Sequence, residues 1–273
     1  MSVPDLGGYT KPPVVEVVAA VRFADLPAVL SAGLGEFWRS TLASDLPDVA
    51  VKAPYTAPTE VFTRKSNVPE LSLDLMEVPP FPRFWFTAVS GDELLQLQSN
   101  WMACNWRKVV PKAVYGRWRS RRDAFQERFG QLSAWVEGRG GHVIPDQCEV
   151  TYTNHIYPMD GIWRKHAEAH KVFRPLSPLP SLPLVYPEHE ILQASYVIGD
   201  QDEPVGRVHV KVQPAFSLKD DTPIFVMELT ARGAPHASSL DGVMSFLDQG
   251  RQAVVTIFNS ITTPEAQEGW GKE

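Results

Sequence analysis

Hydrophobic positions along the chain recur at two spacings, which together predict alternating strands and helices. Residues 14–23 form a nearly continuous apolar run rich in valine, typical of a strand that is buried on both faces. Residues 26–42 and 113–137 repeat their apolar positions every three or four residues, which predicts amphipathic helices. The apolar stripe of the longer helix consists of Val114, Trp118, Phe125, Phe129, Leu132 and Val136.

Between these two helices, shorter segments alternate between apolar and polar residues, as half-buried strands do. The predicted strands cover residues 49–63, 70–76, 83–89 and 94–101. The last two form a hairpin that turns at residues 90–92, where Ser-Gly-Asp is a turn signal. In its second strand, Leu95 and Leu97 face one way, and Gln96 and Gln98 face the other.

The second part of the chain repeats this order of elements. A strand is predicted over residues 148–157, a short helix over 161–172 and a long helix over 238–262. Three strands come before the long helix, over residues 191–198, 205–214 and 223–231. Residues 174–187 contain five prolines, which predict an extended connector without helix.

Each half of the chain therefore contains a strand, a helix, several antiparallel strands and a long helix. This order predicts an α+β protein of two similar halves, residues 12–140 and 141–265, joined in one integrated unit over residues 1–273. We expect curved antiparallel sheets covered by the long helices. TATA-binding-protein-like and helix-grip folds share this order, and the comparison concerns the order of elements alone.

The charge of the chain is unevenly distributed. The 273 residues are 44% hydrophobic, enough for a sizeable core, and carry a net charge of −6. Residues 107–139, however, hold nine basic residues against three acidic ones, which gives this segment +6 and leaves −12 for the rest. The protein as a whole is thus no polycation, but one segment of it is strongly basic.

The compartment is inferred from the absence of export signals. No run of about 20 apolar residues occurs, so we expect no membrane span. The amino terminus lacks a basic region followed by an apolar run, so we expect no signal peptide and a cytoplasmic location. The two cysteines, Cys104 and Cys148, are then expected to be reduced and buried.

Motifs of known chemistry are absent from the sequence. It contains no nucleophile elbow, no phosphate-binding loop and no zinc-protease helix motif. His166 and His170 stand four residues apart and could share a metal ion, but no third ligand is evident. Cys104 lacks a recognisable base and orienting group, which favours a buried thiol over a nucleophile. We therefore expect no catalytic residue, no metal and no cofactor.

Two segments combine residue types that suit recognition. Residues 101–108 place Trp101 and Trp106 beside amide and cationic groups, either as core aromatics at a strand-to-helix corner or as a stacking surface for a nucleotide, nucleic acid or protein. Residues 151–154 alternate, so that Thr151 and Thr153 line either an ordinary exposed sheet face or a polar binding face.

Arginines on the predicted helix 113–137 flank its apolar stripe. Positions 117, 121 and 128 fall within about 40° of one another at 100° per residue. We expect them to border a concave surface that recognises an anionic group or an acidic partner segment, because guanidinium suits carboxylate and phosphate. The candidate surface comprises Arg107, Arg117, Arg121, Arg128, Gln96, Gln98, Thr151 and Thr153. The alternative is that the arginines pair with acids elsewhere in the chain.

Several short elements resemble a known family over nearly the whole chain. They are the Pro-Pro-Val-Val-Glu of residues 12–16, Leu97-Gln98 with Asn-Trp-Arg-Lys of 105–108, Thr-Tyr-Thr-Asn of 151–154, Leu-Thr-Ala-Arg-Gly of 229–233 and the closing stretch 258–271. The chain resembles a sporadically distributed, strictly bacterial family of proteins of similar length, with Asn-Trp-Arg and Thr-Tyr-Thr-Asn as the most specific elements. The family has no assigned activity, so the resemblance implies no catalytic residue. It implies a bacterial origin and one integrated unit, and sporadic occurrence fits accessory systems such as toxin–antitoxin or phage-defence loci.

These observations favour a non-enzymatic binding or regulatory protein that acts through a protein partner. The alternative is a nucleic-acid or nucleotide binder that uses the basic segment Arg107–Arg139, against which the overall acidity counts. A second alternative is an enzyme whose site has no recognisable motif.

Overall fold

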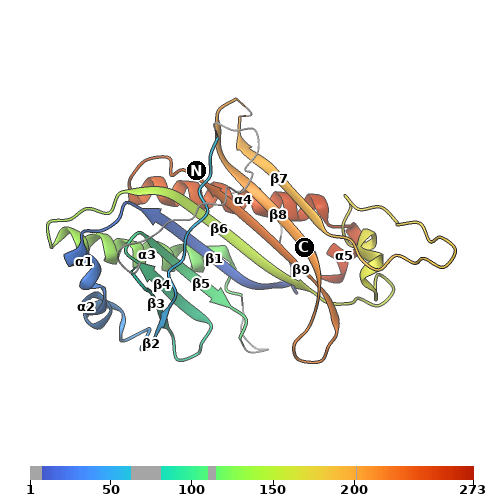
Figure 1. Ribbon diagram of the computed structural model, residues 1–273, viewed down its shortest axis with the longest axis horizontal. Helices are drawn as coiled ribbons and strands as arrows, with labels where there is room; N and C mark the ends of the chain where they lie inside the picture. The colour runs from blue at the N-terminus through green and yellow to red at the C-terminus, as the bar shows by residue number, and fades with distance from the viewer. Residues whose placement is uncertain (1–7, 63–80, 110–114, 201) are drawn as a thin grey trace.

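The computed structural model describes residues 8–62, 81–109, 115–200 and 202–273. Within these residues, nine strands form one antiparallel sheet in the order β2-β3-β4-β5-β1-β6-β9-β8-β7 (Figure 1). The central strand is β1, Val14–Phe23, which pairs with β5 on one side and β6 on the other. The strand predicted over 14–23 is confirmed with the same bounds.

The two halves of the chain build the two sides of this sheet. The first half supplies β2 (Asp48–Lys52), β3 (Arg83–Thr87), β4 (Glu93–Gln98) and β5 (Trp101–Arg107). The second half supplies β6 (Pro145–Ile156), β7 (Leu192–Gly199), β8 (Pro204–Phe216) and β9 (Pro223–Gly233). On each side the last strand of the half, β5 or β9, pairs with β1 or β6, and the earlier strands follow outward, so the halves meet at the β1–β6 pair. The strand predicted over 70–76 lies outside the described residues.

Two long helices pack on one face of the sheet and against each other. They are α3, Arg117–Glu137, which contacts β1 and β5, and α4, Leu240–Ile261, which contacts β6, β8 and β9. In Figure 1 both lie behind the strands. The buried residues of α3 are the predicted stripe, apart from Val114, which lies outside the described residues. The protein is thus of the α+β class.

The helix predicted over residues 26–42 is instead broken into three short pieces. These are α1 (Ala28–Ala32), α2 (Leu34–Phe37) and the π-helix η1 (Trp38–Leu42). The first break falls at Gly33, where an added Cβ would lie 2.9 Å from the ring of Trp135 on α3. Close packing against α3 therefore requires glycine at a position where the sequence periodicity predicts an unbroken helix.

Three further differences from the predicted elements concern short segments. Residues 101–107 form the strand β5, not a corner, because a run of small and apolar residues fits a strand enclosed by β4 and β1 on both sides. The predicted helix 161–172 shrinks to one 3-10 helix, η2, His166–Lys171. A terminal helix, α5, Pro264–Gly269, was not predicted; the Thr263 hydroxyl caps it by accepting from the Ala266 N–H at 3.3 Å.

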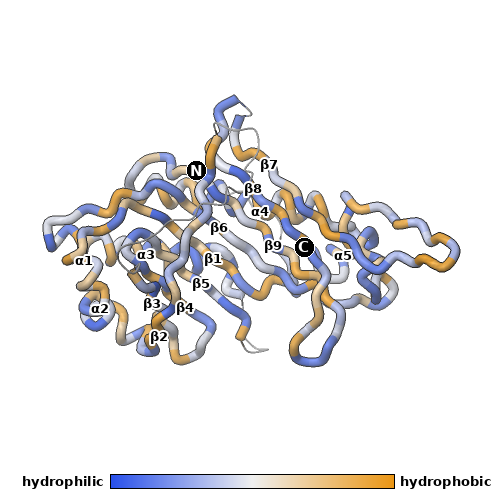
Figure 2. Tube along the Cα trace, viewed as in Figure 1, coloured by the Kyte–Doolittle hydropathy of each residue, from blue (hydrophilic) through white to orange (hydrophobic). Residues whose placement is uncertain are grey.

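The proline-rich connector after η2 forms a protruding loop. Leu182, Leu184 and Val185 in it are exposed, and Figure 2 shows hydrophobic colouring at its tip. Apart from an isolated bridge between residues 182 and 185, the loop carries no regular structure over 174–187, as its prolines predict. Among the described residues, no helix combines the length and the apolarity needed to cross a membrane.

The two faces of the sheet differ in chemistry because side chains alternate along each strand. The helix-bearing face is apolar, and the opposite face, here called the polar face, carries amide, hydroxyl and charged groups. Residues 53–62 cross this polar face after β2 and are here called the strap (light blue in front of the sheet in Figure 1). The strand predicted over 49–63 therefore ends at Lys52, because Pro54 and Pro58 cannot donate to a strand ladder.

Candidate functional site

The first end of the strap is held by Gln98, at the end of β4. Its Oε1 accepts from the Tyr55 N–H at 2.8 Å, and its Nε2 donates to the Tyr55 carbonyl at 3.3 Å. The Tyr55 ring packs on Trp101 with centroids 4.9 Å apart, and the Arg83 guanidinium lies 5.5 Å from the Tyr55 centroid. The backbone is thus bound by one amide, and the side chain by an aromatic and a cation.

The second attachment uses Gln147 on β6 in the same manner. Its Oε1 accepts from the Glu60 N–H at 2.9 Å, and its Nε2 donates to the Pro58 carbonyl at 2.8 Å. Both glutamines are almost fully buried. Each amide thus supplies one acceptor and one donor to an extended backbone, as a neighbouring strand would.

The carboxylate of Glu60 lies in a basic cluster built by β8 and β9. Its Oε2 is 2.8 Å from Arg207 Nη1, its Oε1 is 3.5 Å from Arg232 Nη1, and Oε1 also contacts His209 Nε2. Only 2% of the Glu60 side chain is exposed. Burial of an unpaired carboxylate costs free energy. The basic cluster offsets this cost and so allows the strap to pack against the sheet at Glu60.

The protonation of Glu60 reflects this pairing. Burial alone raises the pKa of the carboxyl, but hydrogen bonds with His209 and Arg207 outweigh that effect, and its pKa lies below the ordinary value. The strap therefore presents an ionised carboxylate to the cluster at neutral pH.

A chain of polar side chains continues across the first half of the polar face. Arg83 donates to Gln96 Oε1 at 3.0 Å, Gln96 donates to Asn105 Oδ1 at 2.8 Å, and Asn105 donates to Glu16 Oε1 at 2.8 Å. Gln96 and Asn105 are buried. The side-chain amides on β4 and β5 therefore hold one another in place, so their orientation is fixed without a bound partner.

On the other half of this face, Thr151 lies next to the basic cluster. Its hydroxyl is 3.1 Å from Glu149 Oε1 and 2.9 Å from the Thr230 hydroxyl. Glu149 also accepts from Arg232 Nε at 2.7 Å, which links this group to the Glu60 cluster. Thr153 follows on the same side of β6, half-buried, opposite Glu16 on β1 and Glu228 on β9.

Arg107 also belongs to the polar face, at the end of β5. Its guanidinium lies 5.7 Å from the Trp85 ring centroid and donates to the Gly91 carbonyl at 3.2 Å. Lys52 Nζ at 4.8 Å and Arg83 at 5.7 Å surround the same ring. Trp85 and its three cations thus form the outer end of this face.

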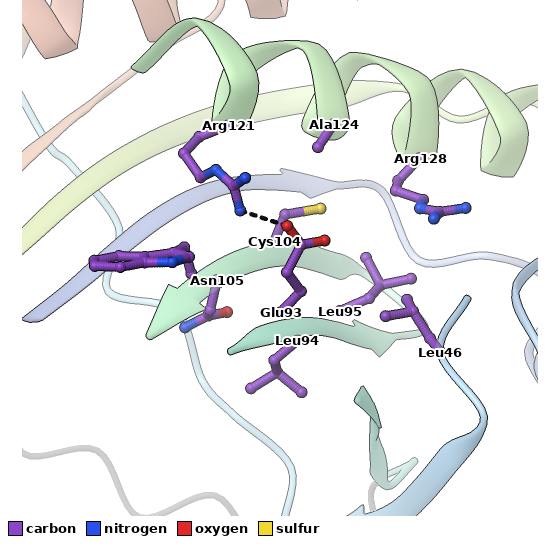
Figure 3. A pocket seen from close by; sticks show the side chains of 10 residues that line it. Leu46, Glu93, Leu94, Leu95, Cys104, Asn105, Arg121, Ala124 and Arg128 are labelled. Carbon is purple, nitrogen blue, oxygen red and sulfur yellow. Dashed lines mark hydrogen bonds and ion pairs between the residues drawn. The ribbon is translucent and has the colours of Figure 1, made fainter. Parts of the chain in front are cut away.

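The arginines of α3 lie on the opposite side of the sheet. Arg121 pairs with Glu93 at 2.7 Å, Arg128 with Asp45 at 2.7 Å, and the exposed Arg117 lies 3.6 Å from Glu273. Figure 3 shows Arg121 and Arg128 reaching from α3 toward the strands, whereas Asn105 points away below them. The structure thus brings together five of the eight predicted surface residues (Gln96, Gln98, Arg107, Thr151 and Thr153) and separates the three α3 arginines from them.

Further ion pairs reduce the free charge of the basic segment. Arg122 contacts Asp248 at 2.8 Å and Arg139 contacts Glu36 at 2.7 Å. With the three pairs above, five of its nine basic side chains lie next to acids outside the segment. This is the pairing that the sequence offered as the alternative to a binding patch.

Sequence reasoning missed the residues that hold the strap. These are Gln147, Arg207, His209, Arg232 and Glu60 itself. A signal for part of the cluster exists in the predicted strand 205–214, where Arg207, His209 and Lys211 alternate with valines. Nothing in the sequence, however, links this strand to a glutamate about 150 positions earlier.

The residues considered for other chemistry lie in structural roles. Burial raises the pKa of the Cys104 thiol to about 12 and that of Cys148 still further. His166 bonds the Ile224 carbonyl at 3.0 Å. Within the parts of the chain that the structure describes, no three His, Cys, Asp or Glu side chains are grouped to hold a metal ion.

Comparison with known proteins does not assign a function to the chain. No protein-family model matches the chain, and no curated protein is significantly similar to it. The site is therefore interpreted from its geometry, which provides backbone recognition by two glutamines, one aromatic contact and one carboxylate site on a single sheet face.

Proposed function

We propose that this is a non-enzymatic binding protein whose polar face recognises an extended, acidic segment of a protein partner. In this proposal the strap is a built-in occupant of the site, and the partner segment displaces it. The observation that carries the proposal is the way the strap is held, through backbone groups paired with Gln98 and Gln147 and one carboxylate held by Arg207.

Backbone recognition supports an exchangeable occupant. Hydrogen bonds to N–H and C=O groups do not depend on the side chains of the bound segment, so another extended chain can make them. Selectivity then comes from the two side-chain positions, an aromatic residue on Trp101 and a carboxylate five residues later at the basic cluster.

The arrangement of the halves fits this proposal. In each half the last strand pairs with the first, and the earlier strands follow outward to the edge of the sheet. This arrangement supports a TATA-binding-protein-like order of elements, in which α3 and α4 occupy one face and leave the other for recognition. The ion pairs of the α3 arginines favour the protein partner over nucleic acid, because they leave fewer cations for phosphates. We further propose an accessory system, such as toxin–antitoxin or phage defence, as the setting, which the neighbouring genes would test.

The test supplies the strap in trans. In a variant whose residues 53–62 are replaced by a Gly-Ser linker of equal length, we expect a fluorescein-labelled peptide of residues 53–62 to bind with micromolar affinity, measured by fluorescence anisotropy. The native chain should bind it far more weakly, because the tethered strap competes at an effective concentration of roughly millimolar. A Glu60→Gln peptide should bind at least about tenfold more weakly, since a hydrogen-bonded charge pair is lost. A peptide with the exposed Thr56 changed to Ser is the matched control.

Two results would contradict this function. One is a folded linker variant, judged by circular dichroism, that does not bind the peptide. The other is equal binding of the Glu60→Gln and native peptides. Binding of a single-stranded oligonucleotide with a steep salt dependence would instead support the nucleic-acid alternative.

A further inference from the structure

A cavity lies on the helix-bearing face of the sheet, away from the strap. Its volume is about 820 Å³, and its walls come from residues 8–14, the end of β5, the start of α3, the strands β6 and β9, and α4. This size is within the range of small-molecule sites, roughly 300–1,000 Å³. The proposed partner recognition does not use this space, so the two can be tested separately.

Three polar groups meet in this cavity. The hydroxyls of Tyr115 and Tyr152 are 2.9 Å apart, and Arg251 on α4 lines the same cavity and acts to lower the pKa of Tyr152. Burial raises the pKa of both phenols, and the charge of Arg251 offsets this only in part, so both stay protonated at neutral pH. Because one hydroxyl donates to the other, the pair keeps one O–H free to donate to a third group.

The charge of the lining has one sign. Among the described residues that line the cavity, four are cationic (Lys11, Lys108, Arg117 and Arg251) and none is acidic. Of these four, the exposed Arg117 lies 3.6 Å from the Glu273 carboxylate. Moreover, Arg251 Nε is buried and has no hydrogen-bond partner in the described part of the chain. A cavity lined in this way in a protein of net charge −6 favours an anion.

The remaining walls are mostly apolar, although Thr10 and Asn154 also line the cavity. Val254, Val255 and Phe258 face the cavity from α4, and Leu229 and Trp106 line it from the sheet. An anion that fills this space must therefore carry an apolar body.

We propose that this cavity binds a small amphipathic carboxylate, whose charged group meets Arg251, Tyr115 and Tyr152 and whose apolar body lies between α4 and the sheet. Guanidinium and phenolic hydroxyls are the donors that suit a carboxylate. Burial of the apolar part supplies most of the affinity, and the three polar groups select the anion and fix its orientation.

The experiment uses the whole chain with 8-anilinonaphthalene-1-sulfonate, a fluorescent apolar anion, and with sodium decanoate as competitor. The wild type should bind the dye at one site per chain, and decanoate should displace it. Arg251→Met should weaken decanoate binding about tenfold or more, because a charged hydrogen-bond donor is lost. Arg119→Met, which removes an exposed cation of α3, should leave both affinities unchanged. Val255→Trp, which fills the cavity from a half-buried position, should abolish binding.

The wild type alone already provides a decisive measurement. Decanoate should raise the thermal midpoint of the wild type, whereas the same concentration of the neutral decyl glucoside should not. The proposal is overturned if decanoate neither displaces the dye nor raises this midpoint. It is also overturned if a folded Arg251→Met binds decanoate as tightly as the wild type does, or if a folded Val255→Trp keeps the dye site. Circular dichroism melts establish which variants are folded at the assay temperature.

Discussion

Arg122 of α3 and Asp248 of α4 form a two-point contact, with Arg122 Nε 2.8 Å and 3.0 Å from the two carboxylate oxygens. Asp248 also accepts from the indole N–H of Trp118 at 2.8 Å. One carboxylate thus ties together the long helices of the two halves. Both partners in the ion pair are mostly shielded from solvent, which makes the pair stronger than an ordinary surface salt bridge.

We predict that Asp248→Ala lowers the free energy of unfolding by about 2–3 kcal/mol. The substitution removes the acceptor of two hydrogen-bond donors, Trp118 and the charged Arg122, and leaves both without this partner. Urea denaturation followed by circular dichroism measures the loss. Asp160→Ala is the matched control, since its pair with Arg164 is exposed and should contribute less than about 1 kcal/mol. Equal losses in both variants would show that the contact between the helices adds no more stability than an exposed ion pair.

The second prediction concerns Trp106, whose side chain is 2% exposed in the core under α3 and α4. Trp106→Ala should cost about 3–5 kcal/mol, the range for truncating a large buried aromatic residue. Its indole N–H has no partner within the described chain, so Trp106→Phe removes volume but no hydrogen bond and should cost less. An unchanged urea midpoint for Trp106→Ala would contradict a core role and would point back to a recognition surface.

The third prediction is a pH dependence that comes from Glu60. Its pKa lies below the ordinary value in the folded protein because His209 and Arg207 bind it, despite the opposing effect of burial. The stability from this group is therefore present above the unfolded pKa of about 4.5, and it is lost as the pH falls through the lower pKa of the folded state. We expect Glu60→Gln to be less stable than the wild type at pH 7 and to lose less stability between pH 5 and pH 3. Parallel urea midpoints for the two proteins over this range would refute the assignment.

The fourth prediction concerns the protruding connector. Leu184 is 96% exposed in a loop without regular structure, so limited chymotrypsin digestion should cut first after Leu184. The fragments 1–184 and 185–273 should elute together in gel filtration, because β9 pairs with β6 and α4 packs on β6 across the cut. Separation into two independently folded pieces would contradict the single integrated unit.

The fifth prediction separates pairing from recognition on α3. Arg121 forms a 2.7 Å ion pair with Glu93, so Arg121→Glu places two carboxylates side by side and should lower the free energy of unfolding by about 1–3 kcal/mol. The double variant Arg121→Glu/Glu93→Arg should largely restore this stability. Arg117→Glu, at a side chain that is 77% exposed, should change stability little. If the arginines also bind an acidic partner, Arg117→Glu/Arg121→Glu loses that binding. Survival of every interaction in the folded double variant would show that these two arginines take no part in recognition.

The sequence alone determined which elements form and which sides of them are buried. The valine-rich run at 14–23, the hairpin after Arg83 and the two long helices all follow from apolar periodicity. The alternation of Leu95 and Leu97 with Gln96 and Gln98 likewise assigned the side chains of β4 to two faces. Periodicity suffices here because an element that is buried on one side must carry its apolar residues at the spacing of its own backbone.

Only the tertiary structure decided what lies on each face. Residues 53–62 resemble a strand in sequence, yet they cross the polar face because two glutamines and a distant basic cluster hold them there. Likewise, the sequence assigned Arg121 and Gln96 to one candidate binding surface, but the two residues lie on opposite sides of the sheet. The physical reason is that a periodic pattern specifies which side of an element is buried and carries no information about which distant segment covers it. The partners of Glu60, Gln98 and Arg251 are brought together only when the whole sheet has formed.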